Sequence, residues 1–336
     1  MKGAQPHLQD PVLLEKGGYG CVFTPPIPCK KSKAKKKVGR TVGKILVKHD
    51  AEVELEASTI IQGIPGWQRY FIVQEQDDCT NKNFHNLRES FEKVCKVPHI
   101  HKAANKNLTQ LISPYGGKNL LSLAIHADFD FLGNLRHVLE GVALLQEAGV
   151  CHFDIKELNI LVDFHGTFRL IDFGSAFLGD AITEKNLWRR QYPFLPEYIP
   201  LPPEFTVQGG LHDGMSLKES IEGMFMKKKT FKLIESVLSV SIEQNKKRVQ
   251  HFWAEQEAWK GDSWLPFFHE FWRKYDSWGV GTIFLRLLHM CLLQREFVEK
   301  VWKIHGENIK TVLKGLLAVD PYDRLTCADA LLLLPA

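Results

Sequence analysis

The hydrophobic positions of this chain favour strands in its first third and mainly helices afterwards. Short apolar runs predict strands within residues 12–23, on both sides of a glycine turn, and again at 41–47, 67–73 and 108–113. Apolar residues between the runs 41–47 and 67–73 recur at helical spacing and predict one helix. These residues are Val53, Ala57, Ile60, Ile61 and Ile64.

Helical spacing dominates from residue 132 onward. Leucines and valines at 132–145 predict an amphipathic helix that ends at Gly149. Two apolar runs, 160–162 and 168–171, flank a His165-Gly166 turn and predict a β-hairpin.

The last third is predicted to be helical as well. Residues 206–274 are mixed in pattern and predict helices with basic ends, and a strongly apolar helix is expected to begin with Asp276. An Asp-Pro turn at Asp320, an arginine at 324 and a short helix end the chain.

Composition adds the expected class of protein. The 336 residues, 44% of them hydrophobic, allow one large domain or two lobes, and the net charge of +4 alone does not argue for nucleic acid. Seven cysteines without a regular framework favour reduced thiols in a cytosolic-type compartment. No apolar run suits a signal sequence or a membrane span. We therefore expect an intracellular protein that is not secreted and has no membrane partner.

A block of six lysines between Lys30 and Lys37 follows prolines that end a strand. Such a block cannot be buried, so it predicts a solvated basic loop at 30–40. Contact of this loop with nucleic acid is an alternative that we do not favour.

One short loop and the hairpin after it carry the densest group of candidate catalytic side chains. His152, Asp154, Lys156 and Asn159 lie in the loop, and Asp172 follows the hairpin. Phosphoryl transfer from ATP needs one carboxylate near the attacking hydroxyl, and another carboxylate and an amide that hold Mg²⁺ on the phosphates. The spacing therefore predicts a phosphoryl-transfer site.

Glycines and a strand lysine near the N-terminus supply candidate phosphate contacts. Gly17, Gly18 and Gly20 let the backbone approach an anion closely, although an ordinary hairpin explains them equally well. Lys44 lies in the run 41–47, with Lys48 as the second choice.

A half-buried strand lysine needs an anionic partner, and three acidic residues of the predicted helix could supply it. They are Glu52, Glu54 and Glu56, and the sequence leaves the choice among them open. Glu56 is favoured because it lies four residues before Ile60 and shares its helix face.

In their order along the chain, these residues resemble the protein-kinase family, and the resemblance covers most of the chain. The motifs are similar to the catalytic loop HxDxKxxN at 152–159, to DFG at 172–174, to the end of APE at 203–204, to the DxWSxG helix start at 276–281 and to DPxxR at 320–324.

The resemblance implies an α+β, two-lobed protein-kinase-like fold with a small β-rich N-lobe and a larger helical C-lobe. We expect the N-lobe at 1–113, including the basic loop 30–40, and the C-lobe at 114–336 with a long insertion at about 206–274. The resemblance implies that the protein takes ATP and protein substrates, and we expect a monomer.

The resemblance also implies roles for single residues. Asp154 would take the hydroxyl proton, and Lys156 would neutralise the γ-phosphate as in serine/threonine kinases. Lys44 would hold the α- and β-phosphates, with Glu56 as its ion-pair partner. Contacts to ATP are implied for Gly17, Gly18, Tyr19, Gly20, Val22, Lys44, Ser113 and Tyr115. Asn159 and Asp172 would bind Mg²⁺, with Mn²⁺ as an alternative.

Supporting roles are expected for four further residues. His152 would hold the loop as a hydrogen-bonder rather than act as a base, and Asp276 would cap its helix and fix the backbone of the catalytic loop. Glu204 and Arg324 would form a buried ion pair.

Two positions depart from the family pattern. Glu15 stands where the glycine loop usually begins, which implies weaker phosphate binding. Phe153 replaces the arginine that normally pairs with a phosphate on the activation loop, so we expect activity that does not need this phosphorylation.

More narrowly, GGYGCVFTPPIPC, VGKIL and PYGGKNLLSL resemble the serine/threonine kinases of large nucleocytoplasmic DNA viruses. This resemblance implies a viral enzyme in the host cytoplasm, with packaging in the virion as a further expectation. The alternatives are a pseudokinase scaffold that binds partners through its insertion and basic loop, and a small-molecule kinase of kinase-like fold.

Overall fold

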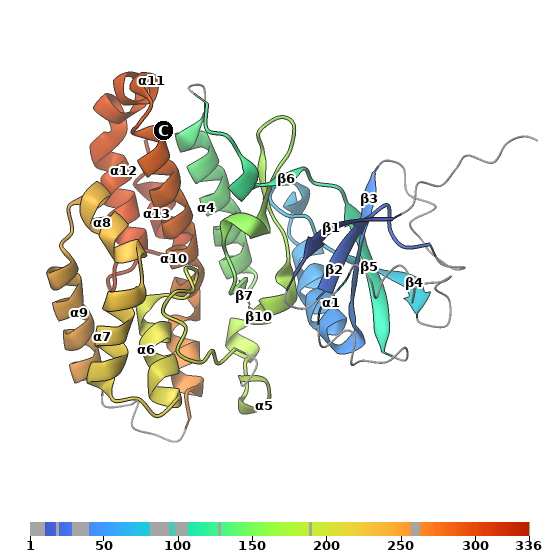
Figure 1. Ribbon diagram of the computed structural model, residues 1–336, viewed down its shortest axis with the longest axis horizontal. Helices are drawn as coiled ribbons and strands as arrows, with labels where there is room; N and C mark the ends of the chain where they lie inside the picture. The colour runs from blue at the N-terminus through green and yellow to red at the C-terminus, as the bar shows by residue number, and fades with distance from the viewer. Residues whose placement is uncertain are drawn as a thin grey trace, which may run out of the picture. The chain divides into compact units, whose positions relative to one another are not determined.

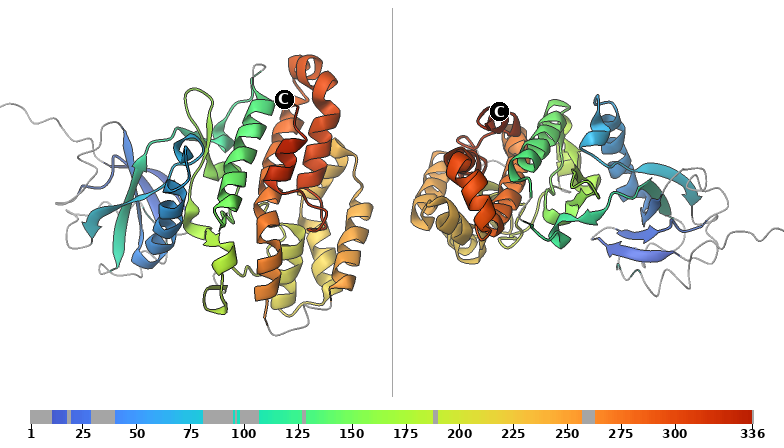
Figure 2. Two further views of the ribbon diagram at one scale, coloured as in Figure 1. Left: turned by 180° about the vertical axis from the view of Figure 1, so that it is seen from behind. Right: turned by 90° about the horizontal axis from the view of Figure 1, so that it is seen from above.

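The computed structural model describes residues 11–17, 20–28, 40–80, 95, 97, 107–126, 129–187, 190–256 and 263–335. Among the positions predicted from sequence, Gly18, Tyr19 and nearly all of the basic loop 30–40 lie outside these residues. The described chain forms two compact units, shown in Figures 1 and 2. The first unit comprises residues 1–63, 72–116 and 172–174, and the second comprises 64–71, 117–171 and 175–336.

The first unit contains a five-stranded antiparallel sheet in the order β1-β2-β3-β5-β4. Its strands are β1 (Val12–Lys16), β2 (Gly20–Thr24), β3 (Thr41–Val47), β4 (Glu75–Thr80) and β5 (Leu108–Pro114). Lys44 lies in the central strand β3, opposite Val22 of β2 and Leu111 of β5. The strands predicted at 12–23, 41–47 and 108–113 are therefore confirmed.

Helix α1 (Lys48–Gln62) packs on one face of this sheet, against β3, β4 and β5 (Figure 1). Because side chains alternate along a strand, Lys44 shares a face with Leu46, which packs against Ala51 of the helix. Ile45 points to the opposite face, where it packs with Cys21, Cys95 and other apolar residues. The strand thus directs Lys44 toward α1.

Cys21 and Cys95 form a disulfide on the sheet face opposite α1. The expectation of reduced thiols is therefore wrong for this pair. Spacing along the chain could not reveal it, because 74 positions separate the two cysteines and only the folded sheet brings them together. Cys151, Cys291 and Cys327 are free and buried.

The second unit begins with η2 (Trp67–Arg69), a short 3-10 helix. The strand predicted at 67–73 is wrong: only Phe71 makes an isolated bridge, to Leu170. The apolar run is instead anchored by Tyr70, whose hydroxyl donates to Glu140 of α4 (Phe131–Glu147) over 3.0 Å.

Short strands and turns carry the loop of candidate catalytic residues. A three-stranded sheet in the order β6-β8-β9 contains the predicted hairpin, and a two-stranded sheet joins β7 to β10. These elements, with the short helices between them, are β6 (Lys118–Asn119), η3 (Leu120–Ser122), β7 (Val150–Cys151), η4 (Glu157–Asn159), β8 (Ile160–Val162), β9 (Phe168–Leu170), η5 (Phe173–Ser175), β10 (Phe177–Leu178) and η6 (Gly179–Ala181).

Helices form the rest of the second unit (Figure 2). They are α5 (Glu184–Leu187), α6 (Pro203–His212), α7 (Leu217–Lys227), α8 (Thr230–Leu238), α9 (Ile242–Glu255), α10 (Leu265–Cys291), α11 (Arg295–Phe297), the π-helix η8 (Val298–Trp302), α12 (Lys303–Leu316) and α13 (Cys327–Leu332). Ser216 and Ser241 begin α7 and α9 with capping boxes, which explains why these polar segments start helices where they do.

Helix α10 is the long central helix of this unit and is buried over most of its length. The helix predicted to begin with Asp276 begins eleven residues earlier, at Leu265, so Asp276 lies in the helix interior and is not its N-cap. The buried aromatic residues at 267–272 extend the apolar surface of the helix towards its N-terminus. The sequence pattern had placed these residues in a separate segment, 206–274. Among the described residues, every helix is too short or too polar to cross a membrane.

Candidate active site

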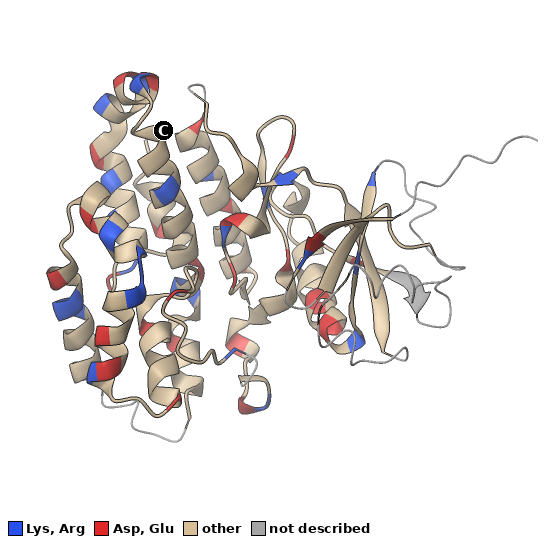
Figure 3. Cartoon of the chain, in the orientation of Figure 1, with Lys and Arg blue, Asp and Glu red and all other residues tan. Residues whose placement is uncertain are grey.

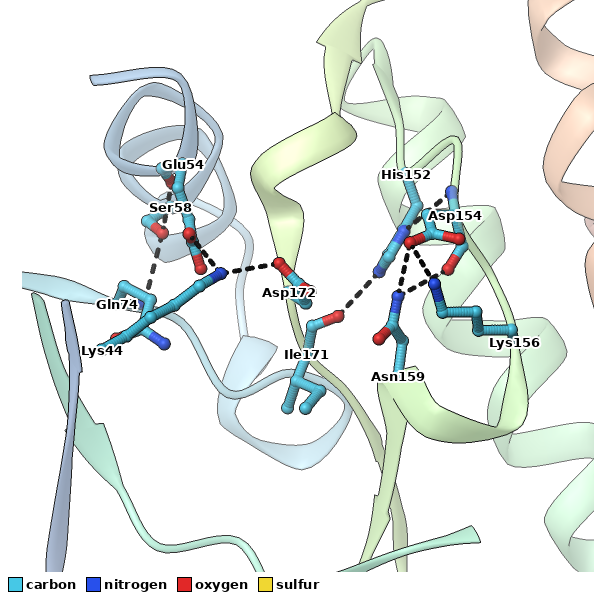
Figure 4. Close-up of polar contacts among 10 residues, drawn as sticks. All are labelled: Lys44, Glu54, Ser58, Gln74, His152, Asp154, Lys156, Asn159, Ile171 and Asp172. Atoms are coloured by element: carbon cyan, nitrogen blue, oxygen red, sulfur yellow. Dashed lines mark hydrogen bonds and ion pairs between the residues drawn. The ribbon is translucent and has the colours of Figure 1, made fainter. Parts of the chain in front are cut away.

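Lys44 is held between two carboxylates within the first unit (Figure 4). Its Nζ donates to Glu54 Oε2 over 2.7 Å and to Asp172 Oδ1 over 2.8 Å. Burial lowers the pKa of Lys44, but the charges of Asp172 and then Glu54 outweigh it, and the net pKa lies above its ordinary value. Lys44 is therefore a permanently charged group.

The pairing of Lys44 with Glu56 is wrong, because the structure pairs it with Glu54. Glu54 is fully buried, whereas Glu56 is exposed. The inward face of α1 runs through Ala51, Glu54, Ser58 and Ile61. Ile60, on which the choice of Glu56 rested, is only half-buried, so the error came from taking the wrong apolar residue as the centre of the face.

Glu54 itself is fixed by its helix. Ser58 Oγ donates to the Glu54 carbonyl over 2.7 Å and accepts from the Gln74 backbone over 3.3 Å, so this turn of α1 is tied to the chain before β4. Complete burial raises the pKa of the Glu54 carboxyl against the opposing effect of Lys44. The ion pair between Lys44 and Glu54 is therefore lost most easily when the pH falls and Glu54 takes up a proton.

Asp154 is the centre of a second cluster, within the second unit (Figure 4). Its Oδ2 accepts from Lys156 Nζ over 2.8 Å and from Asn159 Nδ2 over 3.0 Å. The same Asn159 nitrogen donates to the Asp154 carbonyl over 2.8 Å. Because the amide nitrogen is bound in this way, the Asn159 oxygen is the atom left for a metal.

The other oxygen of this aspartate has a partner that the sequence did not indicate. Tyr198, in the segment before α6, donates its hydroxyl to Asp154 Oδ1. Its ring also lies 5.6 Å from Lys156 Nζ. The prolines around Tyr198 predict a loop but give no direction for its side chain, so sequence reasoning could not have found this contact.

The backbone of the catalytic loop is fixed from α10. Asp276, which is 1% exposed, accepts from the backbone N–H of His152 over 2.7 Å and of Phe153 over 2.9 Å. The predicted role of Asp276 in fixing this backbone is confirmed, although it does not cap its helix. Burial raises the pKa of Asp276, and its contacts with His152 oppose that shift.

His152 also holds the loop, as predicted. Its Nδ1 accepts from the Asp154 backbone N–H, so its Nε2 carries the proton and donates to the Ile171 carbonyl over 3.0 Å. The Ile171 N–H in turn donates to the Asn159 carbonyl over 3.0 Å. The residue that precedes Asp172 in sequence is thereby fastened to the catalytic loop.

Phe153 adopts a left-handed backbone conformation, with φ of 66°, which is strained for a bulky residue. Its ring is fully buried and stacks on Tyr275 at 4.0 Å and on Tyr192 at 5.5 Å. The two backbone bonds to Asp276 and this aromatic packing hold the strained conformation. The position that would carry an arginine in the family pattern is thus part of an aromatic core.

Glu204 and Arg324 form the predicted buried ion pair. Both side chains are fully buried, and two parallel hydrogen bonds of 2.7 Å join them. The pair links the start of α6 to the segment before α13, so it is structural.

The residues of the first unit that were predicted to contact ATP lie in different local environments. Gly17 and Gly20 close the turn between β1 and β2, with a 2.8 Å hydrogen bond from the Gly17 N–H to the Gly20 carbonyl. Ser113 is buried in β5, and the ring of Tyr115 lies 4.1 Å from the guanidinium of Arg40. Their contacts with ATP stay predictions, as does that of Val22.

The two predicted metal ligands, Asn159 and Asp172, each have a side-chain oxygen of the kind that binds a divalent metal. Within the described residues, no group of three or more His, Cys, Asp or Glu side chains could hold a metal by itself. In proteins, Mg²⁺ often binds one or two protein oxygens together with substrate phosphates and water.

Comparison with known proteins supports a kinase. Residues 78–213, less than half of the chain, match the model of the protein kinase domain. The α+β fold predicted from sequence is therefore confirmed, and such a domain implies the use of ATP with a divalent metal.

Several curated proteins share shorter segments with this chain. The serine/threonine-protein kinase SSK22 of Saccharomyces cerevisiae is 54% identical over 39 residues, 12% of this chain and 3% of that protein. The cytokinesis protein sepH of Aspergillus niger is 35% identical over 89 residues, 26% of this chain and 7% of that protein. A probable serine/threonine-protein kinase of Dictyostelium discoideum is 24% identical over 161 residues, 44% of this chain and 25% of that protein.

The chain thus matches only a minor part of the length of these relatives. Their names and the matching domain together support the serine/threonine class of protein kinase.

Proposed function

We propose that this chain is a Mg²⁺-ATP-dependent serine/threonine protein kinase that transfers the γ-phosphate of ATP to hydroxyls of proteins. The observation that carries the proposal is the cluster of Asp154, Lys156 and Asn159, in which a buried carboxylate is oriented by a cation and an amide. This is the set of groups that phosphoryl transfer to a hydroxyl needs.

Each group has a distinct part in the proposed reaction. Asp154 orients the substrate hydroxyl and accepts its proton, while Lys156 offsets the charge that develops on the transferred group. Lys44, kept charged by Asp172 and Glu54, holds the phosphates of ATP. Asn159 and Asp172 each offer an oxygen of the type that Mg²⁺ prefers, and Mn²⁺ is an alternative ion. ATP and its metal supply the phosphoryl group and neutralise its charge.

Transfer of labelled phosphate from ATP to a generic protein substrate tests the proposal. Wild type should transfer phosphate, Asp154→Asn and Asp172→Asn should reduce the rate by about 10²-fold or more, and Asp323→Asn should not. Asp323 is a suitable control because it is exposed and lies outside both clusters. Transfer that survives the Asp154 and Asp172 substitutions unchanged would reject the proposed chemistry.

We further propose that activity does not depend on phosphorylation of the activation segment. Support comes from Phe153, because its ring packs among Tyr275 and Tyr192 and offers no charge to a phosphate. Phosphatase treatment of the purified protein should leave the transfer rate nearly unchanged, and a large loss would contradict this expectation.

The proposed viral origin, with a place in the host cytoplasm and in the virion, has only the sequence motifs as its support. The relatives reported above come from fungi and an amoeba. Mass spectrometry of purified virions from a virus that encodes this chain would decide whether it is packaged.

A further inference from the structure

A cavity of about 490 Å³ lies in the second unit, where α7 ends and α8 begins. Four cationic side chains line it, together with a single acid, Glu197. The cations are Lys227, Lys228, Lys229 and Arg286. In Figure 3 the connection between α7 and α8 is coloured as basic residues. We call this the basic pocket.

Two of the four cations of the basic pocket, Lys227 and Lys229, have no carboxylate partner among the residues that the structure describes. Both are exposed. Glu197, also exposed, is not paired with any of the three lysines. The pocket therefore has an excess of positive charge that faces solvent, and it favours an anionic ligand.

The fourth cation connects the pocket to the catalytic loop. Arg286 of α10 pairs with Glu157, which lies between Lys156 and Asn159 in sequence. One wall of the pocket is thus bonded directly to the loop that carries Asp154.

Another part of the lining belongs to the segment that contacts Asp154. Glu197 and Ile199 line the pocket, and Tyr198 between them donates its hydroxyl to Asp154. Lys228 fastens this segment, because its Nζ donates to the Tyr198 carbonyl over 2.9 Å and to the Pro196 carbonyl over 3.3 Å. Two contacts therefore link the pocket lining to the loop of Asp154, one through Arg286 and one through the segment of Tyr198.

We propose that the basic pocket binds acidic side chains, aspartate or glutamate, next to the phosphorylated residue of a protein substrate, so that this kinase selects acidic sites. This proposal rests on the proposed function, because only a kinase has a phosphorylated substrate. The binding of an acidic peptide can be measured separately, because it does not require phosphate transfer.

The observations favour a peptide over a small free anion. The cavity is as large as a typical small-molecule pocket and exceeds what one carboxylate fills. Glu197 and Ile199 of the pocket lining flank Tyr198, which contacts Asp154, so the pocket lies beside the residue that would accept the substrate hydroxyl. A bound carboxylate also favours the protonated form of Lys228, whose pKa burial lowers to about 7.

Binding of short fluorescent peptides to the full-length protein, without ATP, tests the pocket directly. One peptide carries aspartates around a serine, a second carries lysines in their place, and a third carries phosphoserines. We expect the aspartate peptide to bind about tenfold more tightly than the lysine peptide, or better.

The variant that tests the pocket is K227A/K229A, and its matched control is K247A/R248A on α9. Both remove two exposed positive charges, but only the first pair lines the pocket. The aspartate peptide should bind about tenfold more weakly to K227A/K229A, the change expected when a charge-assisted contact is lost, and unchanged to K247A/R248A. Equal melting temperatures would show that both variants fold.

Each outcome decides the proposal. Equal binding of the aspartate and lysine peptides, or an equal loss in both variants, would overturn it, since bulk charge alone would then explain the binding. Binding of the phosphoserine peptide alone would overturn the choice of a carboxylate ligand. Specific binding with no phosphate transfer would support the pocket and reject the kinase activity. Faster phosphorylation of the lysine peptide would support the activity and reject the pocket.

Discussion

Two buried lysines, one in each unit, have opposite electrostatic surroundings. Lys44 is 6% exposed and Lys228 is 2% exposed, so both lose most of their hydration. Lys44 donates to two carboxylates, and its pKa is raised. Lys228 donates to two neutral carbonyl oxygens, and burial lowers its pKa to about 7, with Glu204 opposing the shift only in part.

The comparison shows that the charge of the acceptors, rather than burial, decides the state of a buried lysine. Lys44 is a fixed cation, which suits its proposed role of holding phosphates at all physiological pH values. Lys228 is close to half protonated at neutral pH, so its charge depends on pH and on what occupies the adjoining pocket.

The largest effect is expected from removing the fixed cation. Lys44→Met should lower kcat for phosphate transfer by about 10²- to 10³-fold, since it removes a charge that stabilises the transition state. Lys48→Met is the matched control, because Lys48 follows closely in sequence but is exposed. A similar loss in both variants, measured with labelled ATP, would contradict the assignment of Lys44.

The second prediction concerns the support of β3. Ile45, next to Lys44, packs against the disulfide between Cys21 and Cys95. Replacing both cysteines with alanine should lower the free energy of unfolding by about 2–4 kcal/mol, as expected for a disulfide that closes a long loop. Denaturant unfolding measures this, and a reducing agent should destabilise the wild type but not the double variant.

The third prediction separates the two candidate partners of the fixed cation. Glu54→Gln should lower the free energy of unfolding by about 1–3 kcal/mol, because it removes a charge-assisted hydrogen bond from a buried lysine. Glu56→Gln should change it by less than about 0.5 kcal/mol, as usual for an exposed residue. Equal effects in chemical denaturation would mean that Lys44 does not depend on Glu54.

The fourth prediction concerns the pH-dependent charge of Lys228. Between its folded pKa of about 7 and its ordinary value of 10.5, Lys228 binds a proton in the unfolded chain but not in the folded protein. The free energy of unfolding should therefore rise with pH across this window, by at most about 1.4 kcal/mol per pH unit.

Lys228→Met should remove this contribution to the slope, while Lys247→Met, at an exposed position of α9, should keep it. Denaturant unfolding at several pH values between 7 and 10 measures the difference. Identical slopes in wild type and Lys228→Met would show that Lys228 stays charged in the folded protein.

The sequence predicted those parts of the molecule that depend on local pattern. The strand of Lys44, the hairpin before Asp172 and the loop around Asp154 follow from alternation and motif spacing, and the structure contains them. The ion pair of Glu204 with Arg324 followed from the family resemblance, because the two motifs lie far apart in the chain.

The rest depends on contacts between distant segments, which no local pattern encodes. The choice of Glu54 needed the true inward face of α1, and the disulfide needed the fold of the sheet. Neither Lys228 nor Tyr198 stands out in sequence. Their roles come from the path of the segment before α6, whose prolines predict a loop without fixing its course.

The smallest expected effect comes from Tyr198, which links Lys228 to the loop that carries Asp154. Its carbonyl accepts from Lys228, and its hydroxyl donates to Asp154 Oδ1, whereas Lys156 and Asn159 donate to Oδ2. We expect the Tyr198 hydroxyl to compete with a substrate hydroxyl for Oδ1. Tyr198→Phe removes only the hydroxyl. It should raise kcat/KM for a protein substrate by about two- to tenfold, the free energy of one net hydrogen bond.

Tyr192→Phe is the matched control, since it removes the same hydroxyl from a tyrosine whose ring stacks on Phe153. A decrease of kcat/KM in Tyr198→Phe would mean that the hydroxyl orients Asp154 for catalysis instead of competing with the substrate. In that case the contact between Lys228 and Tyr198 would support the active geometry, and Lys228→Met should lower the rate as well. The two variants together therefore show whether the segment around Tyr198 restrains the catalytic loop or completes it.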